Sequence, residues 1–242
     1  MGLQTRMDQV LVVSIVFLAV FTQSVSGFGS ALVAMALLPE LVGMGVATPL
    51  VAAMAMTVEG CLLLRYHANL NLRAVWRLAL ASLVGIPLGM LALKRFDENA
   101  AMTILGIVIA AYAVYALFEL KPPELIHPAW GFAFGLLAGM LGGAYNTSGP
   151  PVVVYGNSRR WMPAEFKSNL QGFFLLNSAL VVSGHALSHN FTQAVVKNYL
   201  IALPALALGI LAGVSLDRIV NPDAFRKIVL VLLLAMGVRM II

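Results

Sequence analysis

The residues best suited to chemistry lie in the stretch Gly142-Gly143-Ala144-Tyr145-Asn146-Thr147-Ser148-Gly149-Pro150-Pro151. Glycine and proline at this density cannot hold a continuous helix. Asn146, Thr147 and Ser148 add hydrogen-bonding side chains, Gly149 allows close approach of a backbone, and Pro150 fits the first turn of a new helix. The break exposes free N–H and C=O groups, and the half-helix after it presents a positive N-terminus. The stretch therefore predicts a site for a small anion.

A weaker copy of this stretch, Gln23-Ser24-Val25-Ser26-Gly27-Phe28-Gly29-Ser30, lies near the start of the chain. Gln23 and Ser30 are its polar counterparts of Asn146 to Ser148. Neither stretch contains a carboxylate, so together they suit an anion better than a cation. We expect the two breaks to face each other. The alternative is that these polar groups only satisfy one another and the broken backbone.

A third polar pattern follows the second break. Gln171, Ser178 and His185 recur every seven residues, which places them on one stripe of a helix, with Asn177 beside it. The stripe could line a pathway, or it could hydrogen-bond to other helices at about 0.6 kcal/mol per contact. Gln171 and Asn177 are predicted binding residues. His185 lies near the end of its apolar run, where hydrogen bonding between helices is the better interpretation.

Glu59 is the one acidic residue inside a predicted span. Acidic side chains within the membrane are functional candidates by default, and a proton-coupling role is one interpretation. The other is an ion pair with Arg65 or Arg77 at the membrane interface, because Glu59 lies only about two turns from Arg65.

The composition places these residues in a membrane. Hydrophobic residues make up 61% of the chain and charged residues 10%, against about 25% charged in soluble domains. Mean hydropathy is +0.93. The net charge of +5 does not indicate nucleic-acid binding, because the basic residues occupy short loops between apolar runs. Cys61 is the single cysteine, which excludes an intramolecular disulfide and a cysteine metal cluster. We expect no metal and no cofactor.

The apolar runs repeat the same plan twice. They cover residues 10–25, 31–38, 46–64, 72–93, 100–118, 130–145, 152–155, 169–187, 192–216 and 224–241. The halves align without a gap at an offset of 120, so that Gly29 meets Gly149 and Leu88-Gly89 meets Leu208-Gly209. This indicates a duplication, with one repeat in residues 1–120 and the other in 121–242. Because the first run has an internal counterpart, we interpret it as part of a repeat and not as a signal peptide.

Charge indicates how the repeats are oriented. If each broken segment is a hairpin that enters and leaves on one side, each half crosses the membrane three more times and the second half is inverted. The inside loops then hold most of the basic residues, namely Arg65, Arg73, Arg77, Lys121, Arg159, Arg160, Lys167, Arg218, Arg226 and Lys227. The expected fold is all-α and polytopic, with two inverted repeats, each a broken or re-entrant hairpin plus three transmembrane helices, a plan known from secondary transporters.

The arrangement resembles the sulfite exporter TauE/SafE family, also grouped as 4-toluene sulfonate uptake permeases. The features are Gly27-Phe28-Gly29 followed by Pro39, the stretch Gly142 to Pro151, and Leu170-Gln171-Gly172-Phe173-Phe174 with Asn177-Ser178. The chain departs from the pattern at Ser30-Ala31, where many members have further glycines. The resemblance implies a bacterial cytoplasmic-membrane protein that exports or takes up sulfite or organosulfonates. The motif positions carried over are Gly27, Phe28, Gly29, Asn146, Thr147, Gly149, Pro150 and Gln171.

The predicted function is a permease that moves small sulfur-containing anions by alternating access, with proton coupling as an option. A passive anion channel and a transporter of a carboxylate remain alternatives. An enzyme is not expected, because the sequence has no His-Glu-x-x-His, no Gly-x-Ser-x-Gly and no phosphate loop. The expected partners are the anion and the lipid bilayer.

Overall fold

The computed structural model describes residues 2–120, 122–216 and 222–242, and the side chains of residues 2–6, 222 and 223 are outside that description. Every regular element in these ranges is helical. The helices are α1 (Gly2–Ser26), α2 (Ser30–Val42), α3 (Met44–Tyr66), the 3-10 helix η1 (His67–Asn69), α4 (Leu72–Leu93), α5 (Glu98–Leu117), α6 (Trp130–Tyr145), α7 (Gly149–Ser158), α8 (Pro163–Leu187), α9 (Gln193–Leu216) and α10 (Pro222–Ile241).

Six of these helices are long and apolar enough to cross a bilayer: α1, from Met7, and α3, α4, α5, α8 and α9. α6 and α2 are apolar but shorter. α10 carries Arg226, Lys227 and Arg239 within 20 residues, which makes it more charged than a typical span. The predicted all-α, multi-pass fold class is confirmed. α1 is longer than its expected counterpart α6, so the two broken segments are unequal in length.

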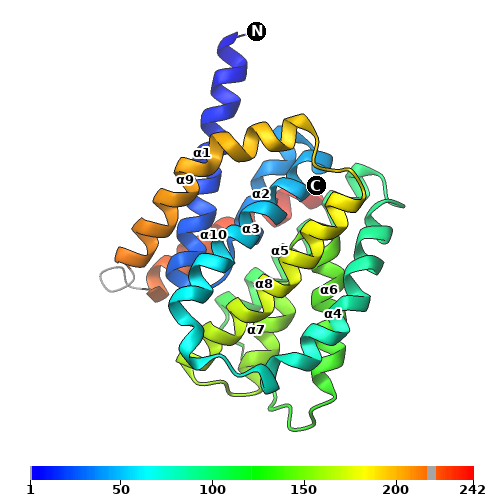
Figure 1. Cartoon of the computed structure of the whole chain (residues 1–242), viewed down its shortest axis with the longest axis vertical. Coiled ribbons are helices and arrows are strands. Elements are labelled where there is room, and N and C mark those ends of the chain that lie inside the picture. The colour runs from blue at the N-terminus through cyan, green and yellow to red at the C-terminus, as the bar shows by residue number, and fades with distance from the viewer. Residues whose placement is uncertain (1, 121, 217–221) are drawn as a thin grey trace.

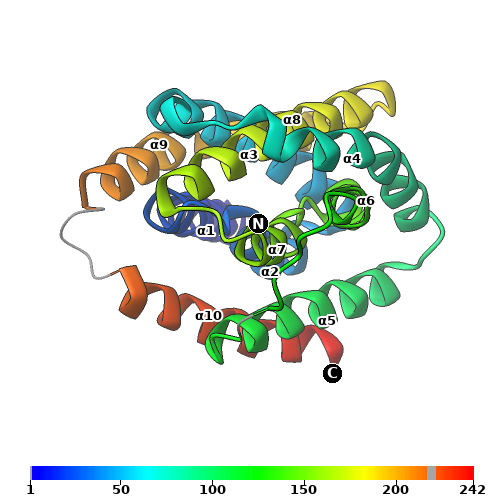
Figure 2. The ribbon, with the colours of Figure 1, turned by 90° about the horizontal axis from the view of Figure 1, so that it is seen from below.

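The two broken segments form hairpins that come from opposite ends of the molecule. In Figure 1, α1 descends from the N-terminus and α2 returns towards the upper end, whereas α6 rises from the lower end and α7 returns to it. Seen from below, α2, α6 and α7 occupy the middle of the bundle (Figure 2). α3, α4, α8 and α9 lie on one side of them, and α5 with α10 on the other. The breaks are therefore enclosed by longer helices.

Glycines hold α6 against α4. A Cβ atom added at Gly135, Gly139 or Gly143 would overlap the backbone of Leu78, Ser82 or Ile86 in α4. These glycines recur every four residues and form one face of α6. Small residues at this spacing let two membrane helices approach closely, so that van der Waals packing and weak polar contacts hold them together. α4 thus fixes the position of the helix that leads into the second break.

The other long helices pack in a related way. α1 packs on α9, where a Cβ at Gly213 would overlap the side chain of Ser24. α5 packs on α10, and Gly106 faces the backbone of Gly237. α3 packs on α8.

The run predicted from residue 169 begins earlier, at Pro163, because proline is well placed at the first position of a helix. Lys121 and Arg218, which we expected on the inside, lie outside the described residues. The division into repeats of residues 1–120 and 121–242 remains a prediction.

Candidate functional site

The first break separates α1 from α2 at three residues that cannot be helical together. Gly27 and Gly29 have φ values of 85° and 106°, in the left-handed region that favours glycine. The second break separates α6 from α7, and there Asn146 has φ 58°. Asparagine is one of the few other residues that tolerate this conformation. Both predicted breaks are therefore real interruptions of the helices.

The two breaks meet at one small cavity of about 20 Å³, which we call the central cavity. Its walls come from both hairpins and from two long helices, and they are formed by Gln23, Gly29, Ser30, Ala31, Leu32, Glu59, Asn146, Thr147, Ser148, Gly149 and Phe174. Space of this size holds about one water molecule. The structure thus brings most of the predicted site residues together around one small cavity.

A relay of side-chain amides joins the first break to α8. The Ser30 hydroxyl donates to Gln23 Oε1, and Gln23 Nε2 donates to Gln171 Oε1 at 3.4 Å. Gln171 Nε2 then donates to the Gly27 carbonyl oxygen at 2.5 Å. Gln171 is completely buried, as a side chain inside the bundle must be if its hydrogen bonds are satisfied there. The relay therefore satisfies part of the broken backbone of the first loop.

The second break is tied to α3. Asn146 Nδ2 donates to the carbonyl oxygen of Thr48 at 2.8 Å. Thr147, next to it, is 1% exposed, and its hydroxyl has no hydrogen-bond partner among the described residues. A buried hydroxyl without a partner is unusual in a folded protein. Because Thr147 lines the central cavity, its hydroxyl is available to a ligand there.

Glu59 reaches the same cavity from α3. Its carboxylate accepts a hydrogen bond from the Ser178 hydroxyl, and within the described part of the chain no arginine forms an ion pair with it. The alternative interpretation, an ion pair with Arg65 or Arg77, is therefore wrong, because the side chain turns inward to α8. The expectation that carboxylates are absent from the loops holds, but an acidic group from another helix faces them.

Some predicted binding residues lie elsewhere. The Phe28 ring packs edge-on against Tyr112 and under the Arg226 guanidinium, away from the central cavity. Pro150 is buried in the first turn of α7. Asn177 packs against Gly142, where an added Cβ would overlap its side-chain oxygen. Gly27 contributes to the site only through its backbone carbonyl oxygen, which accepts a hydrogen bond from Gln171.

Four residues of the site were missed by the sequence reasoning: Ala31, Leu32, Phe174 and Thr48. Phe174 lines the central cavity and lies three residues after Gln171, on the same face of α8, so helical spacing could have identified it. Thr48 contributes a backbone carbonyl, which no side-chain pattern reveals.

Two larger cavities lie towards the two ends of the molecule. The upper cavity, about 320 Å³, is lined by Met44, Gly45, Thr48, Met90, Leu93, Lys94, Phe96, Glu98, Ala101, Gly143, His185 and Asn190. The lower cavity, about 610 Å³, is lined by Tyr115, Ala116, Glu119, Leu120, Pro122, Asn157, Arg160, Trp161, Arg226 and Lys227. The upper cavity reaches the second break, because Gly143 belongs to the last turn of α6 and Thr48 accepts from Asn146.

Comparison with known proteins agrees with this arrangement. A family model described as "Sulfite exporter TauE/SafE" matches residues 12–240. The chain is 25% identical over 229 residues to the "Probable sulfite/organosulfonate exporter TauE" of Cupriavidus necator, with 92% of this chain and 89% of that protein covered. It is 26% identical over 181 residues to the "Probable inner membrane transporter protein TsaS" of Comamonas testosteroni, with 72% of this chain and 76% of that protein covered. No solved structure matches significantly.

The family match covers nearly the whole chain, and its members are transporters rather than enzymes. The six apolar helices supply the membrane spans that such a protein needs. The chain belongs to the sulfite exporter TauE/SafE family and is a multi-pass transport protein of the bacterial inner membrane.

Proposed function

We propose that this protein moves small sulfur-containing anions, of the sulfite or organosulfonate class, across the inner membrane by alternating access. The substrate binds in the central cavity, between Gln23, Gly29 and Ser30 of the first break and Asn146 to Gly149 of the second. Gln171 positions the first break through its hydrogen bond to Gly27. The family description and the name of the Cupriavidus necator relative supply the substrate class.

The observation that carries this proposal is the meeting of both breaks at one buried cavity. A helix broken at membrane depth is tolerated only where protein or a water-filled cavity surrounds it. Sites built from facing broken helices bind small charged substrates in several transporters. The free hydroxyl of Thr147 and the N-terminus of α7 supply donors to an anion there.

Alternating access is supported by the sizes of the three cavities. The central cavity of about 20 Å³ is too small for an anion with several heavy atoms, while larger cavities lie towards both ends of the molecule. We infer that the site opens towards one end at a time. An open channel would instead need a continuous path through the central cavity.

The second part of the proposal is that Glu59 couples transport to protons. A negative anion and a negative carboxylate repel each other strongly in a closed cavity of low dielectric. The anion and a proton on Glu59 would then enter the site together. Ser178 holds the carboxyl group in place in both protonation states, because its hydroxyl can donate to either form.

We further propose that the two hairpins belong to inverted repeats, residues 1–120 and 121–242. The helices support this division: α1 to α5 and α6 to α10 follow each other in the same order, and the bounds of α3 and α8 agree closely at the offset of 120, although α1 begins earlier than its counterpart α6. The pairing of α1 with α9 and of α6 with α4 is what such a symmetry requires. With the lower end of Figure 1 facing the cytoplasm, the end of α7, which Arg159 and Arg160 follow, lies inside, and the end of α4, which Lys94 follows, lies outside.

The test is flux in liposomes containing the purified protein. We expect uptake of sulfite or methanesulfonate that saturates with concentration and rises with an imposed pH gradient. Asn146→Ala should abolish this uptake. Asn198→Ala should not, because it removes the same kind of side chain from a position on α9 where the amide donates to the backbone of its own helix. Transport of simple carboxylates in preference to sulfonates would overturn the substrate class. Non-saturating flux at channel rates would overturn alternating access.

A further inference from the structure

We propose that the upper cavity contains a second anion-binding site, formed by Lys94 and His185, where the substrate binds on its way to or from the central cavity. The proposal rests on the proposed function for its ligand, a sulfite or sulfonate oxyanion. The residues that form this second site line the upper cavity and not the central cavity. At about 320 Å³ the upper cavity has the size of a small-molecule pocket.

His185 provides a buried donor that faces this cavity. The side chain is 3% exposed, and the amide Nδ2 of Asn190 donates to its Nδ1 at 2.9 Å. Nδ1 is then the acceptor, so the ring carries its hydrogen on Nε2. Nε2 is buried and has no hydrogen-bond partner in the part of the chain that the structure describes. A buried N–H group without a partner calls for a ligand or an ordered water.

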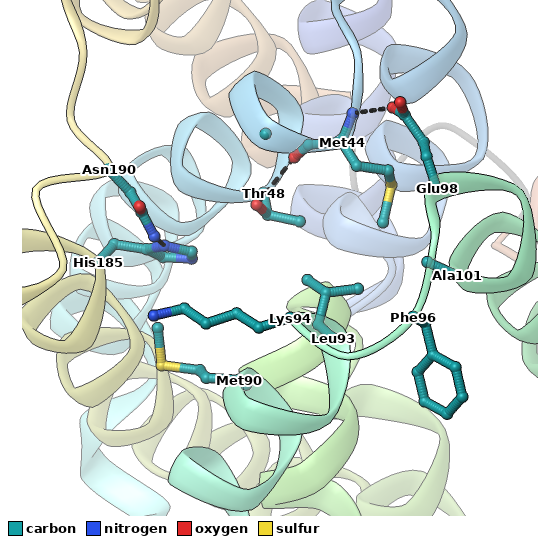
Figure 3. A pocket seen from close by; sticks show the side chains of 12 residues that line it. Met44, Thr48, Met90, Leu93, Lys94, Phe96, Glu98, Ala101, His185 and Asn190 are labelled. Atoms are coloured by element: carbon teal, nitrogen blue, oxygen red, sulfur yellow. Dashed lines mark hydrogen bonds between the residues drawn. The ribbon is translucent and has the colours of Figure 1, made fainter.

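Lys94 provides a positive charge beside this donor. In Figure 3 its ammonium group extends across the cavity towards the imidazole of His185. Among the described residues, no carboxylate forms an ion pair with Lys94. An ammonium and an imidazole N–H are both donors only, so a ligand between them must be an acceptor. A negatively charged oxyanion meets both requirements.

Glu98 also lines the upper cavity, but its carboxylate lies away from the Lys94 ammonium and His185 (Figure 3). Glu98 Oε1 accepts a hydrogen bond from the backbone N–H of Met44 at 2.8 Å, which caps the start of α3. Figure 3 shows Glu98 on the opposite wall from His185 and Lys94. Its charge is thus engaged at a helix N-terminus, where negative charge is favoured.

The floor of the upper cavity connects this site to the transport site. Thr48 and Gly143 line it, and the Thr48 carbonyl holds Asn146 of the second break. His185 also continues the α8 stripe of Gln171 and Ser178, which contact the first break and Glu59. Sequence spacing favoured a role for His185 in joining helices; the structure adds that its buried Nε2 lacks a hydrogen-bond partner among the described residues, in a side chain that lines the upper cavity.

The experiment measures binding of sodium methanesulfonate to the full chain in detergent. Calorimetry follows affinity, and NMR of 15N-histidine-labelled protein follows the His185 signal. Lys94→Met is compared with Arg95→Met, which removes the same charge from the same exposed turn but lies outside the cavity lining. His185→Phe removes the N–H donor and keeps the ring that packs edge-on against Phe191. All variants are repeated with Asn146→Ala, which disables the central site.

We expect methanesulfonate to shift the His185 signal even in Asn146→Ala protein. Lys94→Met and His185→Phe should each weaken this binding about tenfold, as loss of a hydrogen bond to a charged group does, and Arg95→Met should leave it unchanged. Equal effects of Lys94→Met and Arg95→Met, or an unmoved His185 signal, would overturn the upper site. Because Lys94 is exposed, its variant tests the site even if His185→Phe does not fold. If the upper site binds while Asn146→Ala leaves flux intact, the central assignment fails and the present proposal stands.

Discussion

Gln171 on α8 donates a hydrogen bond to the backbone carbonyl oxygen of Gly27, 2.5 Å away and 144 residues earlier in the chain. The same side chain accepts from Gln23. One buried amide thus joins the last part of α1, the first break and α8. The first hairpin is held by a residue that belongs to the other half of the sequence.

Replacing Gln171 should disrupt the site more than the fold. Gln171→Leu keeps the volume but leaves the Gly27 carbonyl and the Gln23 amide without their partner, at a stability cost of about 1–3 kcal/mol. We expect sulfite flux to fall at least tenfold in liposomes while the protein still purifies as a folded species. Gln193→Leu, at the exposed start of α9, is the matched control. Flux equal to that of the unaltered protein would refute the role of this relay.

Asn146 allows conformation and chemistry to be separated. Its φ of 58° suits glycine, so Asn146→Gly should preserve the break and the thermal stability. The variant lacks the amide that donates to Thr48, and we expect it to lose transport. Asn146→Ala should also lose transport, and it should be less stable by about 1–2 kcal/mol while still folding, because alanine is strained at this φ. Thermal unfolding and flux, measured on both variants, test these expectations. Full transport by Asn146→Gly would show that transport needs the backbone conformation at residue 146 but not the amide group.

Glu59→Gln tests the proposed coupling. The amide oxygen of glutamine can still accept from Ser178, so the packing should survive, but the side chain can no longer exchange a proton. We expect anion flux that no longer responds to an imposed pH gradient. Ser178→Ala, which keeps the carboxyl group, should retain the response. A gradient-driven flux in Glu59→Gln would assign coupling to another group.

The α4–α6 contact should be sensitive to single methyl groups. A Cβ at Gly139 would lie 2.7 Å from the Cα of Ser82, and backbone cannot move aside easily. We therefore expect Gly139→Ala to lower stability by about 1–3 kcal/mol, the usual range for overpacking. Gly45→Ala is the matched control, since a Cβ there meets nothing within 4 Å. Thermal unfolding in detergent compares the two, and equal stability would contradict the packing described.

Access to the upper cavity can be tested with a thiol reagent. Cys61 is the single cysteine, so Gly45→Cys in a Cys61→Ser background carries one thiol, at the cavity wall. A membrane-impermeant maleimide should modify it from outside the cell and block flux. Arg160→Cys, at the lower cavity, should react only in inside-out vesicles. The reverse pattern would invert the proposed topology.

The sequence by itself determined the membrane class and the two breaks, because each depends on local composition, and its motifs carried the resemblance to the family. Apolar runs of the right length specify spans, and Gly27, Gly29 and Asn146 specify the interruptions through their own backbone preferences. The stripe on α8 was also predictable, since helical spacing alone places Gln171, Ser178 and His185 on one face.

Tertiary structure decided which of these residues share a cavity. Whether Glu59 turns towards Arg65 or towards Ser178 depends on the packing of α3 against α8, which no local pattern encodes. The same holds for Phe28, which the sequence places beside Gly29 but the fold turns towards Tyr112 and Arg226. Thr48 contributes to the site through its backbone carbonyl oxygen. Because every residue has this group, the sequence could not identify Thr48. Local chemistry specified the parts, and long-range packing determined which atoms meet.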